Sequence, residues 1–191
     1  MNKARTFLPV ALVFVSLCAA HSTTVIAPSF EELVRQADLI FQGKVTAVTS
    51  QWSGEGAQRI IVSYVTLSVE DSLKGTPGPS YTIRMLGGTV DGQTVAVADA
   101  PKFAVGDRDI LFVEHNGSQF IPLVGIMHGR FRVERDSAGA EFIRTNEGKP
   151  LADLARLGRG DQPATTGSGM SASQFKAAIQ AKLAALQNSG R

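Results

Sequence analysis

The segment 101-PKFAVGDRDILFVEHNGSQF-120 surrounds an apolar run with two aspartates, a glutamate and a histidine. Four consecutive apolar residues, 110–113, predict a buried strand, and the polar residues stand where such a strand enters and leaves the core. The pair Asn116-Gly117 tolerates the positive φ angles of a type I′ turn, so we expect a tight hairpin there. This hairpin sets three apolar pairs opposite each other: Val113 and Phe120, Phe112 and Ile121, and Ile110 and Leu123.

Alternating apolar residues predict further strands on both sides of this segment. The expected strands cover 39–52, 59–74 and 81–86, with hairpins at Asp91-Gly92 and around 137–139. Gly43 marks an expected bulge in the first of these strands. Two sets of apolar residues each share one face of a strand: Leu39, Phe41, Val45 and Ala47 in the first strand, and Ile61, Val65, Leu67 and Val69 in the second.

Helical segments are expected before and after the strands. Ser29 stands three residues before Glu32, which is the signature of a capping box, and predicts a short helix to about Ala37. Pro150 and Gly158 are placed to begin and end a second short helix within 146–157. A flexible linker is expected over 158–170. Helical spacing of Phe175, Ile179, Leu183 and Leu186 then predicts an amphipathic helix over 171–188 that docks on this chain or another.

Residues 1–22 have the layout of a secretory signal peptide. Lys3 and Arg5 precede an apolar stretch, 7–20, and small residues follow it. The stretch is too short to span a bilayer comfortably, so we expect a secreted or periplasmic protein without stable membrane insertion. The single cysteine, Cys18, lies inside this segment. We therefore expect a mature chain without disulfides, which suits a bacterial envelope.

The expected mature chain has a balanced charge. Lys3 and Arg5 belong to the leader, so 17 of the 19 basic residues remain, against 17 acidic ones. This balance argues against nucleic acid or an anionic membrane as the main partner. The length of 191 residues and the hydrophobic content of 43% predict one β domain, 29–145, followed by tails.

The order of these segments resembles the netrin-like domain of the tissue inhibitors of metalloproteinases, a pattern also found in secreted bacterial proteins. The resemblance covers roughly 29–125 and is carried by "ADLIFQGKV", "LKG" and "FAVGDRDILF". It implies a mainly β fold: an antiparallel β-barrel of the oligonucleotide/oligosaccharide-binding (OB) type with a short N-terminal helix and C-terminal helices. It also implies a role like that of a protease inhibitor, and it transfers no site residue to this chain.

A binding or interaction module without a cofactor is the function that we expect. Its partner is a protein, such as a co-secreted protease, or a polysaccharide. The loops 53–57 and 87–93, with Trp52 at the rim, form the expected contact region, and Trp52 as a plug of the barrel is the alternative. Three arginines of the last hairpin form a candidate anion or polysaccharide patch, with pairing to Glu134 and Glu141 as the alternative: Arg130, Arg132 and Arg144.

Two further functions stay open. His115, His128 and Asp107 are candidate ligands of a metal-dependent hydrolase or a copper protein, and signal cleavage after Ala20 adds His21, whereas cleavage after Ser22 removes it. The chain has neither the spacing of a known metal motif nor the Gly-x-Ser-x-Gly motif, so the sequence favours a protein without catalytic activity. The third function is a structural or adhesive envelope protein whose working parts are the linker, 158–170, and the C-terminal helix, 171–188. The linker contains the adhesion tripeptide Arg159-Gly160-Asp161, for which the sequence favours a chance occurrence.

Overall fold

A computed structural model describes residues 27–159 and 169–189 of the chain. The predicted signal peptide with its cleavage sites, and most of the predicted linker with Gly160 and Asp161, lie outside the described residues. The elements, in chain order, are α1 (Phe30–Gln36), β1 (Leu39–Ser53), β2 (Ile60–Lys74), β3 (Ser80–Leu86), β4 (Gly88–Val90), β5 (Gln93–Val95), β6 (Arg108–Val113), β7 (Arg130–Arg135), β8 (Glu141–Thr145) and α2 (Ala172–Ser189). Short 3₁₀ turns lie at Gly56–Gln58 and Leu154–Arg156.

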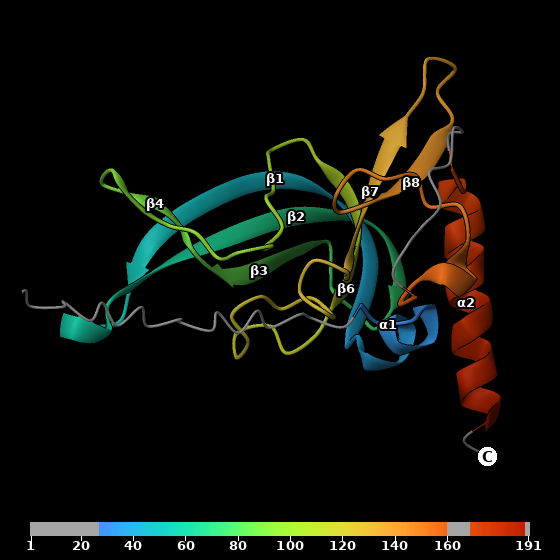
Figure 1. Cartoon of the computed structure of the whole chain (residues 1–191), viewed down its shortest axis with the longest axis horizontal. Helices are drawn as coiled ribbons and strands as arrows, with labels where there is room; N and C mark the ends of the chain where they lie inside the picture. Colours follow the sequence, from blue (N-terminus) through green and yellow to red (C-terminus); the bar gives the residue numbers. More distant parts are fainter. Residues whose placement is uncertain (1–26, 160–168, 190–191) are drawn as a thin grey trace, which may run out of the picture.

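The fold is mainly β and antiparallel. Six strands form one sheet in the order β3-β2-β1-β6-β7-β8, and β4 and β5 form a separate hairpin. Figure 1 shows β1 and β2 arching side by side, with the β4 hairpin near one end of the arch and α1 and α2 at the other. The two edge strands, β3 and β8, do not pair with each other within 27–159 and 169–189, so the strand ladder is open and the closed barrel is not observed.

The capping box at the start of α1 is present as predicted. The Glu32 backbone N–H donates to Ser29 Oγ, and the Glu32 carboxylate accepts from the Ser29 backbone N–H at 2.8 Å. Both bonds occupy groups that would otherwise be unpaired at the start of a helix. The Ser29 backbone N–H and the Ser29 hydroxyl both donate to the Glu32 carboxylate, and these two bonds lower the pKa of Glu32. α1 therefore begins at the predicted place and buries Leu33 and Val34.

Three irregularities interrupt the pairing of β1 with β2. The register shifts at Ile40/Phe41, at Gln42/Gly43, where the expected bulge occurs, and between Val45 and Ala47. The bulge after Val45 was not predicted. It puts one extra residue into β1, so Ala47 does not share the face of Val45 as the alternation suggested. Val48, Ser50 and Trp52 take over that concave face instead, opposite Val65, Ser63 and Ile61 of β2.

The hairpin predicted at Asn116-Gly117 is wrong in register. Val113 bridges to Leu123 rather than Phe120, and Phe120 is exposed. The Asn116 side chain bonds to β3 instead: its Nδ2 donates to the Thr82 carbonyl at 2.8 Å, and its Oδ1 accepts from the Arg84 N–H at 3.0 Å. The loop after β6 thus covers the outer edge of β3. To reach that edge, the loop has to be longer than a two-residue turn.

The other two predicted hairpins are confirmed. Asp91 and Gly92 have φ angles of 51° and 77° between β4 and β5, as a type I′ turn requires. In the β7–β8 hairpin the Asp136 N–H donates to the Ala140 carbonyl at 3.0 Å, so residues 137–139 form the predicted three-residue loop. Gly139 closes it with a φ of 84°.

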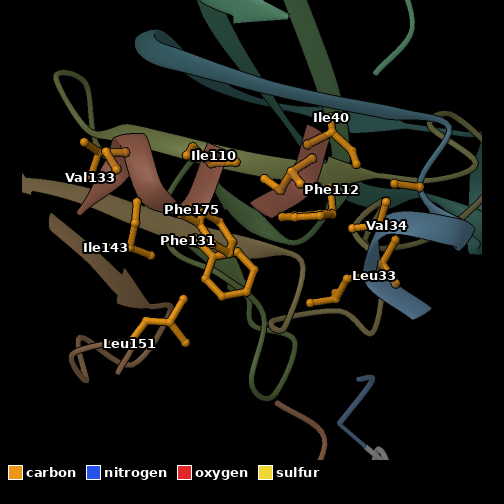
Figure 2. Close-up of a cluster of buried hydrophobic side chains, with 14 residues drawn as sticks. Leu33, Val34, Ile40, Ile110, Phe112, Phe131, Val133, Ile143, Leu151 and Phe175 are labelled. Carbon is orange, nitrogen blue, oxygen red and sulfur yellow. The ribbon is translucent and has the colours of Figure 1, made fainter. Parts of the chain in front are cut away.

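The core lies on both faces of the sheet. The concave face of β1, β2, β3 and β6 encloses one apolar cluster that includes Phe41, Leu67 and Leu111. A second cluster lies between the sheet and the two helices, and Figure 2 shows Phe112, Phe131 and Phe175 at its centre. The predicted stripe of α2 takes part in it: Phe175 and Ile179 are buried, and Leu183 and Leu186 are partly buried. The C-terminal helix therefore docks on its own chain.

The helix predicted within 146–157 does not form. Pro150 bridges to Arg144 of β8, and the Leu151 N–H donates to the Ile143 carbonyl at 3.0 Å. This segment follows the outer edge of β8 because the backbone groups of that edge strand bind it. Only the 3₁₀ turn Leu154–Arg156 is helical, with its N-cap at Asp153.

Candidate functional site

A cavity of about 360 Å³ opens on the concave face of the sheet. We call it the concave cavity. Its walls come from β1, β2, β3, the β4–β5 hairpin and the segment 94–103. They are largely apolar, with Val48, Val65, Met85, Val97 and Phe103 among the lining side chains. This volume and composition fall within the range of ligand sites in proteins.

A few hydroxyl groups are placed within these apolar walls. Ser50 Oγ and Ser63 Oγ lie 2.8 Å apart, and Ser63 Oγ donates to the Gly87 carbonyl at 2.7 Å. Gly88 packs directly over both serines, and a Cβ at this position would collide with their oxygens. The absence of a side chain at Gly88 therefore allows β4 to cross β1 and β2 at contact distance.

Trp52 lies at the rim of the sheet, between the two loops that the sequence predicts as the contact region, 53–57 and 87–93. Its Nε1 donates to Asp91 Oδ2 at 3.4 Å, which links it to the tip of the β4–β5 hairpin. The Arg59 guanidinium lies 4.4 Å from the centre of the indole ring. Trp52 is partly exposed, so it is not a fully buried plug. A partly exposed tryptophan stacked on an arginine combines two residue types that dominate protein interfaces.

Arg130 fixes the outer wall of the concave cavity. Its Nη1 donates to the Lys102 carbonyl at 2.7 Å, and its guanidinium lies 4.2 Å from the centre of the Phe103 ring. Its other nitrogens bind Asp109 Oδ1 at 2.9 Å and Asp107 Oδ2 at 2.8 Å. One buried side chain thus connects the lining segment 102–103 with β6 and β7.

The Arg130 and Asp109 pair is shielded from water. Arg130 is 3% exposed and Asp109 is 0% exposed. Burial raises the pKa of the Asp109 carboxyl, while the positive charge and hydrogen bonds of Arg130 act in the opposite direction. Polar residues of this segment therefore do not lie only at strand ends, and a carboxylate stands inside the core with its own counter-ion.

The three arginines of the predicted patch lie in different environments. The guanidinium of Arg130 is occupied by its ion pairs with Asp107 and Asp109, and Arg144 binds Glu134 at 2.6 Å. Arg132 lines a separate open groove of about 480 Å³ beside several paired charges. Pairing across the hairpin, the alternative named above, also holds for Arg135 with Glu141 at 2.8 Å.

The candidate metal ligands do not meet. His115 is exposed on the loop after β6, with Nδ1 3.1 Å from the Gln119 side-chain nitrogen. His128 is half-buried in another cavity, of about 290 Å³, where burial lowers its pKa. Asp107 belongs to the Arg130 network. Among the described residues, no three histidine, cysteine, aspartate or glutamate side chains lie close enough to hold a metal ion.

Comparison of the chain with models of protein families gives no match, and comparison with curated proteins gives no relative. In the part of the chain that the structure describes, no helix is long and apolar enough to cross a membrane.

Proposed function

We propose that this chain is an exported binding module without catalytic activity, and that it holds a protein partner at the concave cavity. The observation that carries the proposal is the cavity of about 360 Å³, with apolar walls and a few oriented hydroxyls, open at the end of the sheet. An apolar side chain of the partner fills this cavity, while Trp52 and Arg59 at the rim contact the partner's surface around that side chain.

A protease is one class of protein partner that fits this proposal. Its basis is the resemblance of 29–125 to the netrin-like inhibitor domains, together with our proposal that the sheet is an opened variant of the OB-type barrel. Two contacts support the second point: β1 pairs with both β2 and β6, and the Leu86 N–H donates to the Phe120 carbonyl at 2.7 Å. The loop after β6 thereby approaches β3 where a closed barrel would continue its ladder.

The experiment uses random dodecapeptides displayed on phage and selected on the purified chain. Selected peptides are synthesised and titrated, with the fluorescence of the single tryptophan as the signal. We expect Val48→Arg to weaken binding by about tenfold or more, because it places a charge in the cavity. Thr49→Arg is the matched control, since residue 49 is exposed on the opposite face of the same strand, and it should leave the affinity unchanged.

Equal affinity of Val48→Arg and the unmodified chain would overturn the proposed site. Failure of the selection to yield any binder would do so as well. In a parallel assay, the purified chain is added to a panel of metalloproteases. Inhibition that Val48→Arg abolishes would assign the partner class, and a panel without inhibition removes proteases of this class from the proposal.

A further inference from the structure

Part of β1 has an edge that no other strand covers. β6 pairs with β1 only over Leu39–Lys44. The next residue, Val45, still exchanges backbone hydrogen bonds with the loop before β6, with Asp107 at 2.8 Å and Gly106 at 2.9 Å. Ala47–Ser53 pairs with β2 alone. Within 27–159 and 169–189 no other backbone group bonds to this stretch, which we call the free edge.

The hydrogen-bond pattern shows which residues point toward the free edge. The Ile61 carbonyl accepts from the Gly87 N–H at 2.9 Å, and the Val69 N–H donates to the Pro79 carbonyl at 3.0 Å. Odd-numbered residues of β2 therefore bond toward β3, and residues 62, 64 and 66 bond toward β1. Their partners in β1 are 51, 49 and 47. The backbone groups of Val48, Ser50 and Trp52 consequently point outward.

These outward residues also lie on the concave face. Val48 and Ser50 line the concave cavity, and Trp52 lies at its rim. From residue 48 to residue 52 the free edge offers three N–H and three C=O groups over about 13 Å, at about 3.3 Å per residue. Only an extended backbone has complementary groups at this spacing. A strand added here would alternate its side chains between the two faces, so that some would enter the cavity from its edge.

We propose that the free edge of β1 receives an extended segment of the protein partner by β-strand addition. This inference rests on the proposed function and specifies how the partner binds. A second copy of this chain, paired edge to edge, would direct the side chains of its own Val48, Ser50 and Trp52 over its own cavity. That arrangement leaves both cavities empty, whereas a linear segment satisfies the edge and fills the cavity together.

Amide hydrogen exchange, measured by NMR with the selected dodecapeptides, tests the proposal on the full chain. The amides of Ala47, Thr49 and Gln51 bond to β2 and should exchange slowly with or without peptide. The amides of Val48, Ser50 and Trp52 should exchange fast in the free protein and about tenfold more slowly when a peptide is bound.

A proline at position 50 provides the second measurement. Ser50→Pro removes one outward N–H but no bond to β2, so it should weaken peptide binding by about tenfold. Ser50→Ala is the matched comparison, because it removes the same hydroxyl and keeps the N–H, so the affinity of Ser50→Pro should fall about tenfold below that of Ser50→Ala. The exchange experiment needs no variant, so it decides the matter even if Ser50→Pro does not fold.

Three outcomes would overturn strand addition. One is that peptides bind, and that Val48→Arg weakens their binding, but that the amides of Val48, Ser50 and Trp52 still exchange fast in the complex. This result would refute strand addition while the proposed function stands. Protection that rises with protein concentration in the absence of peptide would assign the edge to a second copy instead. A library without any binder would refute both the strand addition and the cavity as a peptide site.

Discussion

Replacing Arg130 should destabilise this protein more than replacing any exposed arginine. Arg130→Met leaves the Asp109 carboxylate at 0% exposure without its hydrogen-bonded ion-pair partner and removes the bonds that Arg130 makes to the Lys102 carbonyl and Asp107. Breaking a buried ion pair from one side costs about 3–5 kcal/mol. That is a large part of the about 5–15 kcal/mol by which domains are stable.

The assay is urea unfolding followed by circular dichroism, with Arg144→Met as the control. Arg144 pairs with Glu134 at a site where the two side chains are 30% and 41% exposed, so its loss should cost less than about 1 kcal/mol. The double variant Arg130→Met/Asp109→Leu should recover much of the lost stability, because it also removes the uncompensated charge. A loss for Arg130→Met no larger than that for Arg144→Met would refute the reasoning.

The pH dependence of the same variant gives a further check. Burial already raises the pKa of Asp109 above its ordinary value of 3.8, and removal of Arg130 takes away the two largest opposing effects, so that only the weaker positive charge of Arg132 still lowers this pKa. A carboxyl whose pKa is raised by folding favours the folded state at low pH and loses that contribution as the pH rises through the folded pKa. Arg130→Met should therefore be least impaired in acid and most impaired at neutral pH.

Three other expectations concern separate parts of the fold. Hydrogen bonds from Arg108 lower the pKa of Glu70 and Glu141 below 4.5, so these ion pairs should stabilise the fold above that pH and lose this contribution as the pH falls through the lowered pKa values. Arg108→Met should therefore reduce the loss of stability in acid, measured by urea unfolding at a series of pH values. An unchanged loss in acid would exclude these ion pairs as its cause. Ser29→Ala should cost about 1 kcal/mol in urea unfolding through loss of the α1 cap, and no measurable change would contradict the capping box. Phe175→Ala should cost about 3–5 kcal/mol, since the ring is fully buried between α2 and the sheet; a cost below about 1 kcal/mol would mean that α2 does not dock as described.

Local patterns predicted the regular parts of the fold. The alternation of β1 and β2, the capping box at Ser29 and the turn at Asp91-Gly92 depend on residues close in sequence. Such signals need no knowledge of the tertiary structure. The stripe on α2 predicted an apolar contact correctly, but it did not identify the surface that the helix covers.

The remaining features depend on contacts between distant residues. The bulge after Val45 has no signal in "VTAV", because the strand alternates acceptably in either register. Asn116 has the composition of a turn, yet its side chain bonds to β3, more than 30 residues away along the chain. The bulge changed which residues of β1 share the concave face, and the bonds of Asn116 replaced the predicted hairpin turn.

The buried pair in the candidate site had a partial signal. Asp109 directly precedes four apolar residues, so a carboxylate in that position requires a partner inside the core. The alternation of β7 correctly separated Arg130 from Phe131. The identity of the partner follows only from the pairing of Leu111 with Arg130, which the sequence does not provide. The concave cavity likewise arises from segments of five strands and a loop.

The most direct test of the account is photo-crosslinking from the two faces of β1. A photoreactive benzoylphenylalanine is placed at position 48, which lines the concave cavity, or at position 49, which points away from it, and the chain is irradiated in the medium of the cells that produce it. We predict a discrete adduct with another polypeptide from position 48 and none from position 49. Adducts from position 49 alone, or equally from both, would contradict the claim that this protein binds its partner at the concave cavity.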